Sequence, residues 1–178
     1  RKVDPFFVVS LANPSMPIVL GELKVSGYSD YLHPYDENHV IGIGKETVPS
    51  DSDTFSWYQG VKISFFDVTY VFAPVELAKY EIGDRGTNSP VLTDHKAFLF
   101  NKEKKLLALP VSVARINESQ YPEGVPSWAY GELVWQGVYV FEISLATEEK
   151  MVLRGTITHA ENGDVYDSSR YVSRTLYI

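Results

Sequence analysis

A hairpin-like unit that recurs along the chain is the feature that most constrains its fold. Each copy is a β-rich run, a short turn and a second β-rich run, and the three copies cover residues 7–23, 64–80 and 139–155. In the first two copies the turn ends at Pro17 and Pro74, and the two align without a gap; the third has an inserted residue and lacks the proline. Self-similarity at long spacing predicts a repeat architecture, in which each unit buries its apolar face only against its neighbours.

The spacing of the copies predicts the size of the repeat. Equivalent positions, Ser10, Asp67 and Glu142, are 57 and then 75 residues apart, and both intervals contain further β-rich runs. A hairpin plus about two more strands makes a four-stranded antiparallel blade, as in a β-propeller. We therefore predict an all-β, propeller-like array. It would hold about two complete blades, preceded by the last two strands of one blade and followed by the first one or two strands of another.

The composition agrees with an all-β fold. Twelve Tyr, nine Phe and three Trp favour strands, because flat rings pack well on pleated surfaces, and helical periodicity is almost absent. We treat residues 1–178 as a single propeller domain and expect both ends to be cuts within a longer protein. Strands are predicted at residues 6–11, 18–25, 39–44, 61–68, 75–82, 96–100, 106–113, 133–144, 151–158 and 170–178.

Charge, hydropathy and cysteine content exclude several classes of protein. The net charge is −7 and the pI is about 5.1, which disfavours nucleic acid as a partner. No run approaches the roughly 18 apolar residues that a membrane helix needs, so we predict no membrane-spanning segment. The absence of cysteine rules out disulfides, thiolate zinc sites and cysteine nucleophiles, and leaves the cellular compartment undecided.

Several strings carry a family resemblance that spans essentially the whole chain. The most specific are GVKISFFDVT at residues 60–69 and DHKAFLF at residues 94–100, supported by residues 31–35, 82–87 and 107–111. They resemble the secreted archaeal and bacterial proteins that have a C-terminal β-propeller domain distantly related to the WD type. The resemblance implies a propeller fold and a secreted or cell-surface location. It supplies no catalytic residues and so implies no activity.

Metal ligation has four weak candidates. His33 and His39 flank a loop that also carries carboxylates, but a metal needs at least three converging ligands, so a turn role is favoured. Asp51 and Asp53 resemble half of a calcium loop whose required glycine and bidentate glutamate are missing. We predict no metal and no cofactor.

Catalytic constellations are also weak. No Gly-x-Ser-x-Gly nucleophile elbow accompanies His95 or His159. Asp67 and Glu142 occupy the same repeat position, where a carboxylate is more typical of a turn than of acid–base catalysis. We therefore predict that the chain is not an enzyme.

An insertion at residues 115–130 interrupts the repeat. Long loops on repeat scaffolds often form the binding face, and Tyr121, Trp128 and Tyr130 are residue types enriched at contact hot spots. The insertion is either a recognition loop that binds through these three residues or a flexible loop without a function.

Three functions follow from these observations. We favour a secreted or cell-surface binding or scaffold module with a protein or glycan partner and no turnover. One alternative is a carboxylate-dependent hydrolase of the propeller type, with two carboxylates within about 10 Å in a cleft. The other is a structural module that forms homo-oligomers by pairing its open sheet edges.

Overall fold

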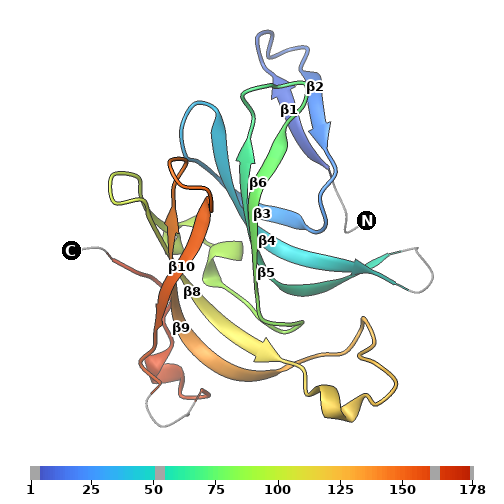
Figure 1. Ribbon diagram of the computed structural model, residues 1–178, viewed down its shortest axis with the longest axis vertical. Coiled ribbons are helices and arrows are strands. Elements are labelled where there is room, and N and C mark those ends of the chain that lie inside the picture. Colours follow the sequence, from blue (N-terminus) through green and yellow to red (C-terminus); the bar gives the residue numbers. More distant parts are fainter. Residues whose placement is uncertain (1–4, 51–54, 161–164, 177–178) are drawn as a thin grey trace.

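The chain forms two four-stranded antiparallel sheets and one two-stranded hairpin, shown in Figure 1. The computed structural model describes residues 5–50, 55–160 and 165–176. The hairpin consists of β1 (Phe6–Ser10) and β2 (Ile18–Leu23). The first sheet contains β3 (Tyr28–Pro34), β4 (His39–Pro49), β5 (Ser56–Asp67) and β6 (Val75–Ile82). The second sheet contains β7 (Leu99–Asn101), β8 (Leu106–Arg115), β9 (Glu132–Ile143) and β10 (Met151–Ile157).

Strands follow chain order across each sheet, so neighbouring strands are joined by a turn or a loop, and the loop between β8 and β9 is the long insertion. Short 3₁₀ turns are also found in the described part of the chain: η1 (Pro90–Leu92), η2 (His95–Ala97), η3 (Glu118–Gln120) and η5 (Ser168–Arg170). The described part of the chain contains no helix long and apolar enough to cross a membrane.

The predicted repeat is confirmed. Its three copies are the β1–β2, β5–β6 and β9–β10 hairpins, and the last two form the outer half of a complete four-stranded sheet. Both complete sheets and the preceding pair of strands therefore stand where the spacing of the copies predicted them.

Several strand predictions were wrong in detail: β4 ends at Pro49 instead of residue 44, and β5 begins at Ser56 instead of residue 61. β3 was missed, because its sequence carries Asp30, His33 and Pro34, and its pairing with β4 rather than its own pattern holds it extended. Residues 95–97 form η2 instead of a strand, since the Asp94 side chain caps the turn by accepting a hydrogen bond from the backbone N–H of Lys96 (3.0 Å). Residues 171–176 pair with no strand among the described residues, and a strand exists only where a neighbour completes its ladder.

The hydrophobic core lies between the two sheets. Alternate residues of β4 and β5, such as Ile43 and Phe65, belong to the same buried cluster as Leu109 of β8. Tyr80 of β6 and Phe141 of β9 bridge the sheets, with ring centroids 4.9 Å apart in an edge-to-face arrangement. Complete burial of one such side chain stabilises the fold by about 1.5–3 kcal/mol. Each sheet therefore hides the apolar face of the other, as stacked repeats require.

Candidate functional site

The turn that follows β6, between the two sheets, has a glycine at residue 83 and another at residue 86, and it positions the candidate site. Gly83 and Gly86 have φ angles of +66° and +112°, a region that other residues seldom adopt. Thr87 fixes the turn to β8: its Oγ1 accepts a hydrogen bond from the backbone N–H of Ala114 (2.9 Å) and donates one to the carbonyl of the same residue (3.2 Å). The turn therefore presents Arg85 at the junction of the sheets.

The guanidinium of Arg85 lies against two aromatic rings from different elements. Its Cζ is 4.6 Å from the centroid of Trp57, at the start of β5, and 5.6 Å from that of Tyr130, at the end of the insertion. Cation–π contacts of this kind stabilise a guanidinium without neutralising it. Nε and Nη1 are buried and have no hydrogen-bond partner, and no ion pair joins Arg85 to a described carboxylate. Arg85 is thus a partly buried cation without a counter-ion in the described part of the protein.

A pocket of about 230 Å³ opens beside Arg85. It is lined by Lys45, Tyr58, Gln59, Arg85, Gly86, Thr87, Asn88 and Tyr130. Lys45 supplies a second cation, and its Nζ donates a hydrogen bond to the carbonyl of Thr87. Burial lowers the pKa of Lys45 to about 8, against the opposing effect of Asp30, so the amine is still largely protonated at neutral pH. Among the described residues, the pocket lining includes two cations and no carboxylate.

Two amide side chains complete the polar wall. The Gln59 amide donates through Nε2 to the carbonyl of Ser127 (3.0 Å), and Oδ1 of Asn88 accepts from the backbone N–H of Ser89 (2.9 Å). Among the hydrogen bonds of the described residues, this leaves Oε1 of Gln59 as an acceptor and Nδ2 of Asn88 as a donor. The pocket therefore offers both kinds of hydrogen-bonding group.

The insertion flanks the pocket, and its three predicted residues take two different positions. Tyr130 lines the pocket and is 67% exposed. Tyr121 and Trp128 form a separate edge-to-face pair (6.3 Å), with Trp128 53% exposed. The loop is tied to the Arg85 turn, because the Gly131 backbone N–H donates to the carbonyl of Arg85 (2.7 Å). A role in binding for these residues stays a prediction.

The sequence analysis missed Arg85, Trp57 and Lys45. A signal for Trp57 did exist, because Trp57-Tyr58-Gln59-Gly60 resembles Trp135-Gln136-Gly137, two residues out of register with the hairpin alignment. Nothing in the linear pattern indicates that the start of β5, the turn after β6 and the end of the insertion meet at one point.

A family model described as a beta propeller domain matches residues 1–178, the full length of the chain. This chain belongs to that beta-propeller family. The two complete sheets are thus two propeller blades, the β1–β2 hairpin is the outer half of a preceding blade, and the Arg85 pocket lies between blades.

The propeller chain is similar to two curated archaeal proteins. It is 39% identical to an uncharacterized protein of Archaeoglobus fulgidus and 41% identical to the uncharacterized protein MJ1554 of Methanocaldococcus jannaschii, each over 110 residues. The matches cover 62% of this chain but only 16% of each relative. No solved structure matches the chain significantly.

The two candidate histidines of the first blade do not converge on a common point. His33 Nδ1 lies 2.9 Å from the hydroxyl of Tyr31, and its ring packs 4.7 Å from that of Phe98. His39 Nδ1 lies 2.7 Å from Oδ1 of Asp36. Burial lowers the pKa of His33, which favours its neutral form. Both side chains thus have structural contacts of their own.

A metal site finds no further support in the blades. Within residues 5–50, 55–160 and 165–176, no group of three or more His, Cys, Asp or Glu side chains is arranged to hold a metal ion. Asp51 and Asp53 lie outside the described residues.

The two repeated acids sit in different surroundings. Asp67 accepts a hydrogen bond from the backbone N–H of Thr69 (2.7 Å), which is the turn role predicted for it. Glu142 instead lies 3.6 Å from the guanidinium of Arg154 on the neighbouring strand.

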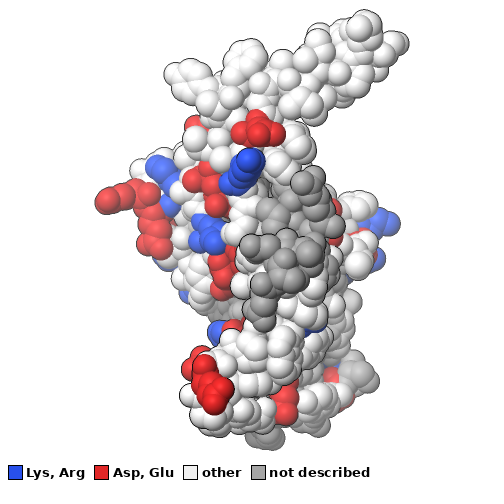
Figure 2. Space-filling model, turned by 90° about the vertical axis from the view of Figure 1, so that its right-hand side faces the viewer, with Lys and Arg blue, Asp and Glu red and all other residues white. Residues whose placement is uncertain are grey.

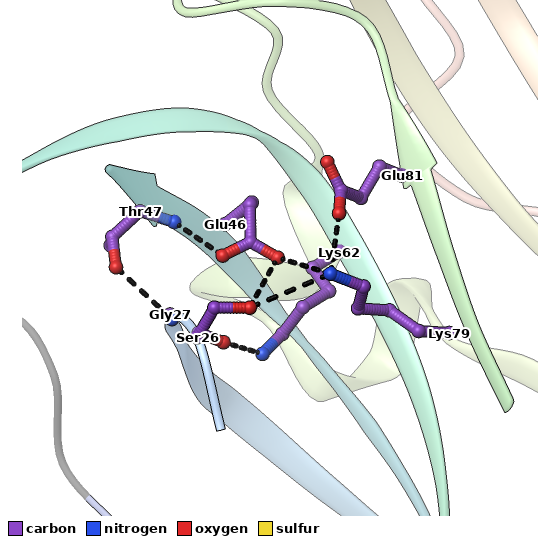
Figure 3. Close-up of polar contacts among 7 residues, drawn as sticks. All are labelled: Ser26, Gly27, Glu46, Thr47, Lys62, Lys79 and Glu81. Carbon is purple, nitrogen blue, oxygen red and sulfur yellow. Dashed lines mark hydrogen bonds and ion pairs between the residues drawn. The ribbon is translucent and has the colours of Figure 1, made fainter. Parts of the chain in front are cut away.

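A buried ion cluster lies on the face of the first blade that points away from the second blade (Figure 3). Lys62 is 1% exposed and donates through Nζ to the carbonyl of Ser26, and Glu46 is 6% exposed. Lys79 bridges two carboxylates, at 3.0 Å from Glu46 and 2.7 Å from Glu81. The charged groups drawn in Figure 3 are thus matched by partners within the first blade and its entry loop, unlike Arg85.

Hydrogen bonds keep Glu46 ionised despite its burial. Desolvation by itself would raise the pKa of Glu46, but hydrogen bonds from the Thr47 backbone, Lys79 and Ser26 and the charge of Lys62 hold it below its ordinary value. The Ser26 hydroxyl and the Thr47 N–H lie 2.9 and 2.8 Å from its two carboxylate oxygens. Both carboxylate oxygens of Glu46 thus have hydrogen-bond partners. The cluster therefore has a structural role, in which it holds the loop between β2 and β3 against the blade.

Proposed function

We propose that this propeller chain is the binding module of a secreted or cell-surface protein and that it recognises an extended ligand, a glycan or a protein, without turning it over. One observation carries the proposal. A pocket with an unpaired guanidinium opens between two blades, beside a long loop that exposes aromatic rings. Ligand sites favour such junctions, where a few polar groups converge among aromatic side chains.

The position of the pocket supports recognition of something larger than the pocket itself. Tyr130 reaches the pocket and Trp128 stands two residues away with half of its surface exposed, so a ligand seated beside Arg85 can extend over the loop. Aromatic residues of this kind carry much of the energy at contact surfaces. The family resemblance supports the secreted or cell-surface location.

The pocket chemistry favours binding over hydrolysis. A glycoside-cleaving site needs a pair of carboxylates flanking the bond, whereas none of the described residues that line this pocket is a carboxylate. We infer that the hydrolase alternative does not apply to this pocket.

A glycan array and a pull-down of surface proteins, each run with wild type and Trp128→Ala, test the proposal. We expect loss of about tenfold or more in affinity for the captured ligand in the variant. Tyr70→Ala is the matched control, because Tyr70 is 78% exposed and follows the end of β5 opposite to Trp57. Equal binding by wild type and Trp128→Ala would exclude the insertion from the site.

A second candidate function, assembly of copies, is favoured by the β1–β2 hairpin. Residues 5–21 contain no charged side chain, and the hairpin forms the uncharged projection at the top of Figure 2. Its exposed side chains include Phe7, Met16 and Ile18, at 48%, 68% and 61%. An uncharged, apolar β edge is a template for pairing with another chain. Light scattering should then show association that Ile18→Lys abolishes, and a monomeric wild type would dismiss this candidate.

A further inference from the structure

The charge of the inter-blade pocket points to an anionic ligand. Lys45 and Arg85 both line the pocket, while the chain as a whole carries a net charge of −7. The carboxylate that acts on Lys45 is Asp30, and Arg85 has none among the described residues. A partly buried cation without a counter-ion is costly, and an incoming anion would remove that cost while making charge-assisted hydrogen bonds.

The other pocket groups identify the rest of the ligand. A hydroxyl both donates and accepts hydrogen bonds, which matches the Nδ2 donor of Asn88 and the Oε1 acceptor of Gln59. A carboxylate side chain of a peptide accepts only, so it would leave the Gln59 oxygen unused. The aromatic rings of Tyr58 and Tyr130 supply flat apolar walls beside these groups.

The size of the pocket limits how much of the ligand it holds. Its volume of about 230 Å³ is below the range of about 300–1,000 Å³ usual for drug-sized molecules. One charged ring fits this space, and the following units would run along the insertion towards Trp128.

We infer that the pocket binds the carboxylate-bearing ring of an acidic sugar, a hexuronate unit within a longer glycan. This inference rests on the proposed binding function and names its ligand class. In it, Arg85 and Lys45 pair with the carboxylate, Gln59 and Asn88 bond the ring hydroxyls, and Tyr130 packs against the ring.

Titration calorimetry with two trisaccharides that share a ring configuration tests the inference: trigalacturonate and neutral galactotriose. We expect wild type to bind trigalacturonate at least about tenfold more tightly, because only this ligand makes charge-assisted hydrogen bonds. Arg85→Gln and Lys45→Gln should each remove most of that preference. Lys104→Gln, on the exposed β7–β8 turn, is the matched control and should change nothing.

A salt series on wild type keeps the test independent of folding effects in the variants. The affinity for trigalacturonate should fall between about 50 mM and about 500 mM salt, while binding of the neutral trisaccharide stays constant. Equal binding of both sugars, no binding of either, or retention of the preference in Arg85→Gln would overturn the acidic-sugar assignment. Preferential binding of a polyglutamate peptide over trigalacturonate would overturn it in favour of an acidic protein.

These outcomes separate the ligand assignment from the proposed function. If wild type captures a neutral glycan or a protein and Trp128→Ala does not, the binding module stands and only the acidic-sugar ligand fails. If no glycan or protein is captured by wild type, both fail together.

Discussion

At the scale of single residues, the backbone at Gly86 sets the position of Tyr130 in the pocket. A Cβ atom at this position would lie 2.9 Å from the Tyr130 ring and 2.9 Å from the Ala114 Cβ, in a backbone region that L-residues seldom adopt. We expect Gly86→Ala to lower the free energy of unfolding by about 2 kcal/mol and to disturb the pocket.

Gly124→Ala separates these two effects. Gly124 has a similar φ of +107° but nothing within 4 Å of an added Cβ, so this variant suffers backbone strain without a clash. Urea unfolding of both variants measures the difference. An equal loss of stability in the two variants would contradict the proposed contact between residue 86 and Tyr130.

Glu46 makes the stability of the first blade depend on pH. Because its pKa is lower in the folded state than in the unfolded chain, Glu46 stabilises the fold above the ordinary glutamate pKa and loses this contribution as the pH falls through the folded value. Glu46→Gln should therefore cost about 2 kcal/mol near neutral pH and progressively less as the pH falls below the ordinary glutamate pKa and through the folded value.

Urea unfolding of wild type and Glu46→Gln across this pH range measures the difference directly. Glu103→Gln, on the exposed β7–β8 turn, is the control and should follow wild type throughout. A constant gap between wild type and Glu46→Gln would show that the carboxylate is not the group that titrates.

At the scale of elements, the stacking of strand faces determines which aromatic residues matter for stability. Phe65 on β5 is completely buried between the blades, whereas Phe72, in the turn after the same strand, is 75% exposed. Phe65→Ala should lower the free energy of unfolding by about 3–5 kcal/mol, and Phe72→Ala by less than about 0.5 kcal/mol. Chemical denaturation measures both, and comparable losses would contradict the assignment of the β5 face to the inter-blade core.

The sequence could predict those strands in which the order of apolar and polar residues agrees with the burial of each residue in the structure. β6 was predicted with the bounds that the structure shows and β9 within one residue at each end, because turn residues bound their apolar runs. β5 begins at Ser56, five residues before its predicted start at residue 61. β3 was missed because the hydrogen bonds that define it come from β4, a partner that the local sequence does not specify.

The candidate site was predictable only in part, for a related reason. The insertion stands out as a break in the repeat, so Tyr121, Trp128 and Tyr130 could be named in advance. Arg85 and Trp57 could not be identified as site residues from the sequence. They come together only because the stacking of the blades brings β5, the turn after β6 and the insertion to one place.

At the scale of the whole molecule, the chain has apolar surface on both sides of its two stacked blades. The face of the second blade that points away from the core holds an apolar groove of about 400 Å³, lined mainly by residues such as Leu106, Val138 and Val140 and crossed by residues 172–176. On the opposite side, Phe6 of the β1–β2 hairpin stacks on Phe66 of the first blade (4.5 Å). The β1–β2 hairpin thus covers one side of the first blade, and the chain matches only 16% of the length of its two archaeal relatives.

The central claim is that two blades, stacked through their apolar faces, form a cationic pocket between them. A crystal structure of the chain in complex with trigalacturonate tests this claim most directly. We predict that β3–β6 and β7–β10 pack face to face and that a sugar carboxylate lies against the guanidinium of Arg85, between Trp57 and Tyr130. Sheets that do not share a core, or a sugar bound away from Arg85, would contradict it.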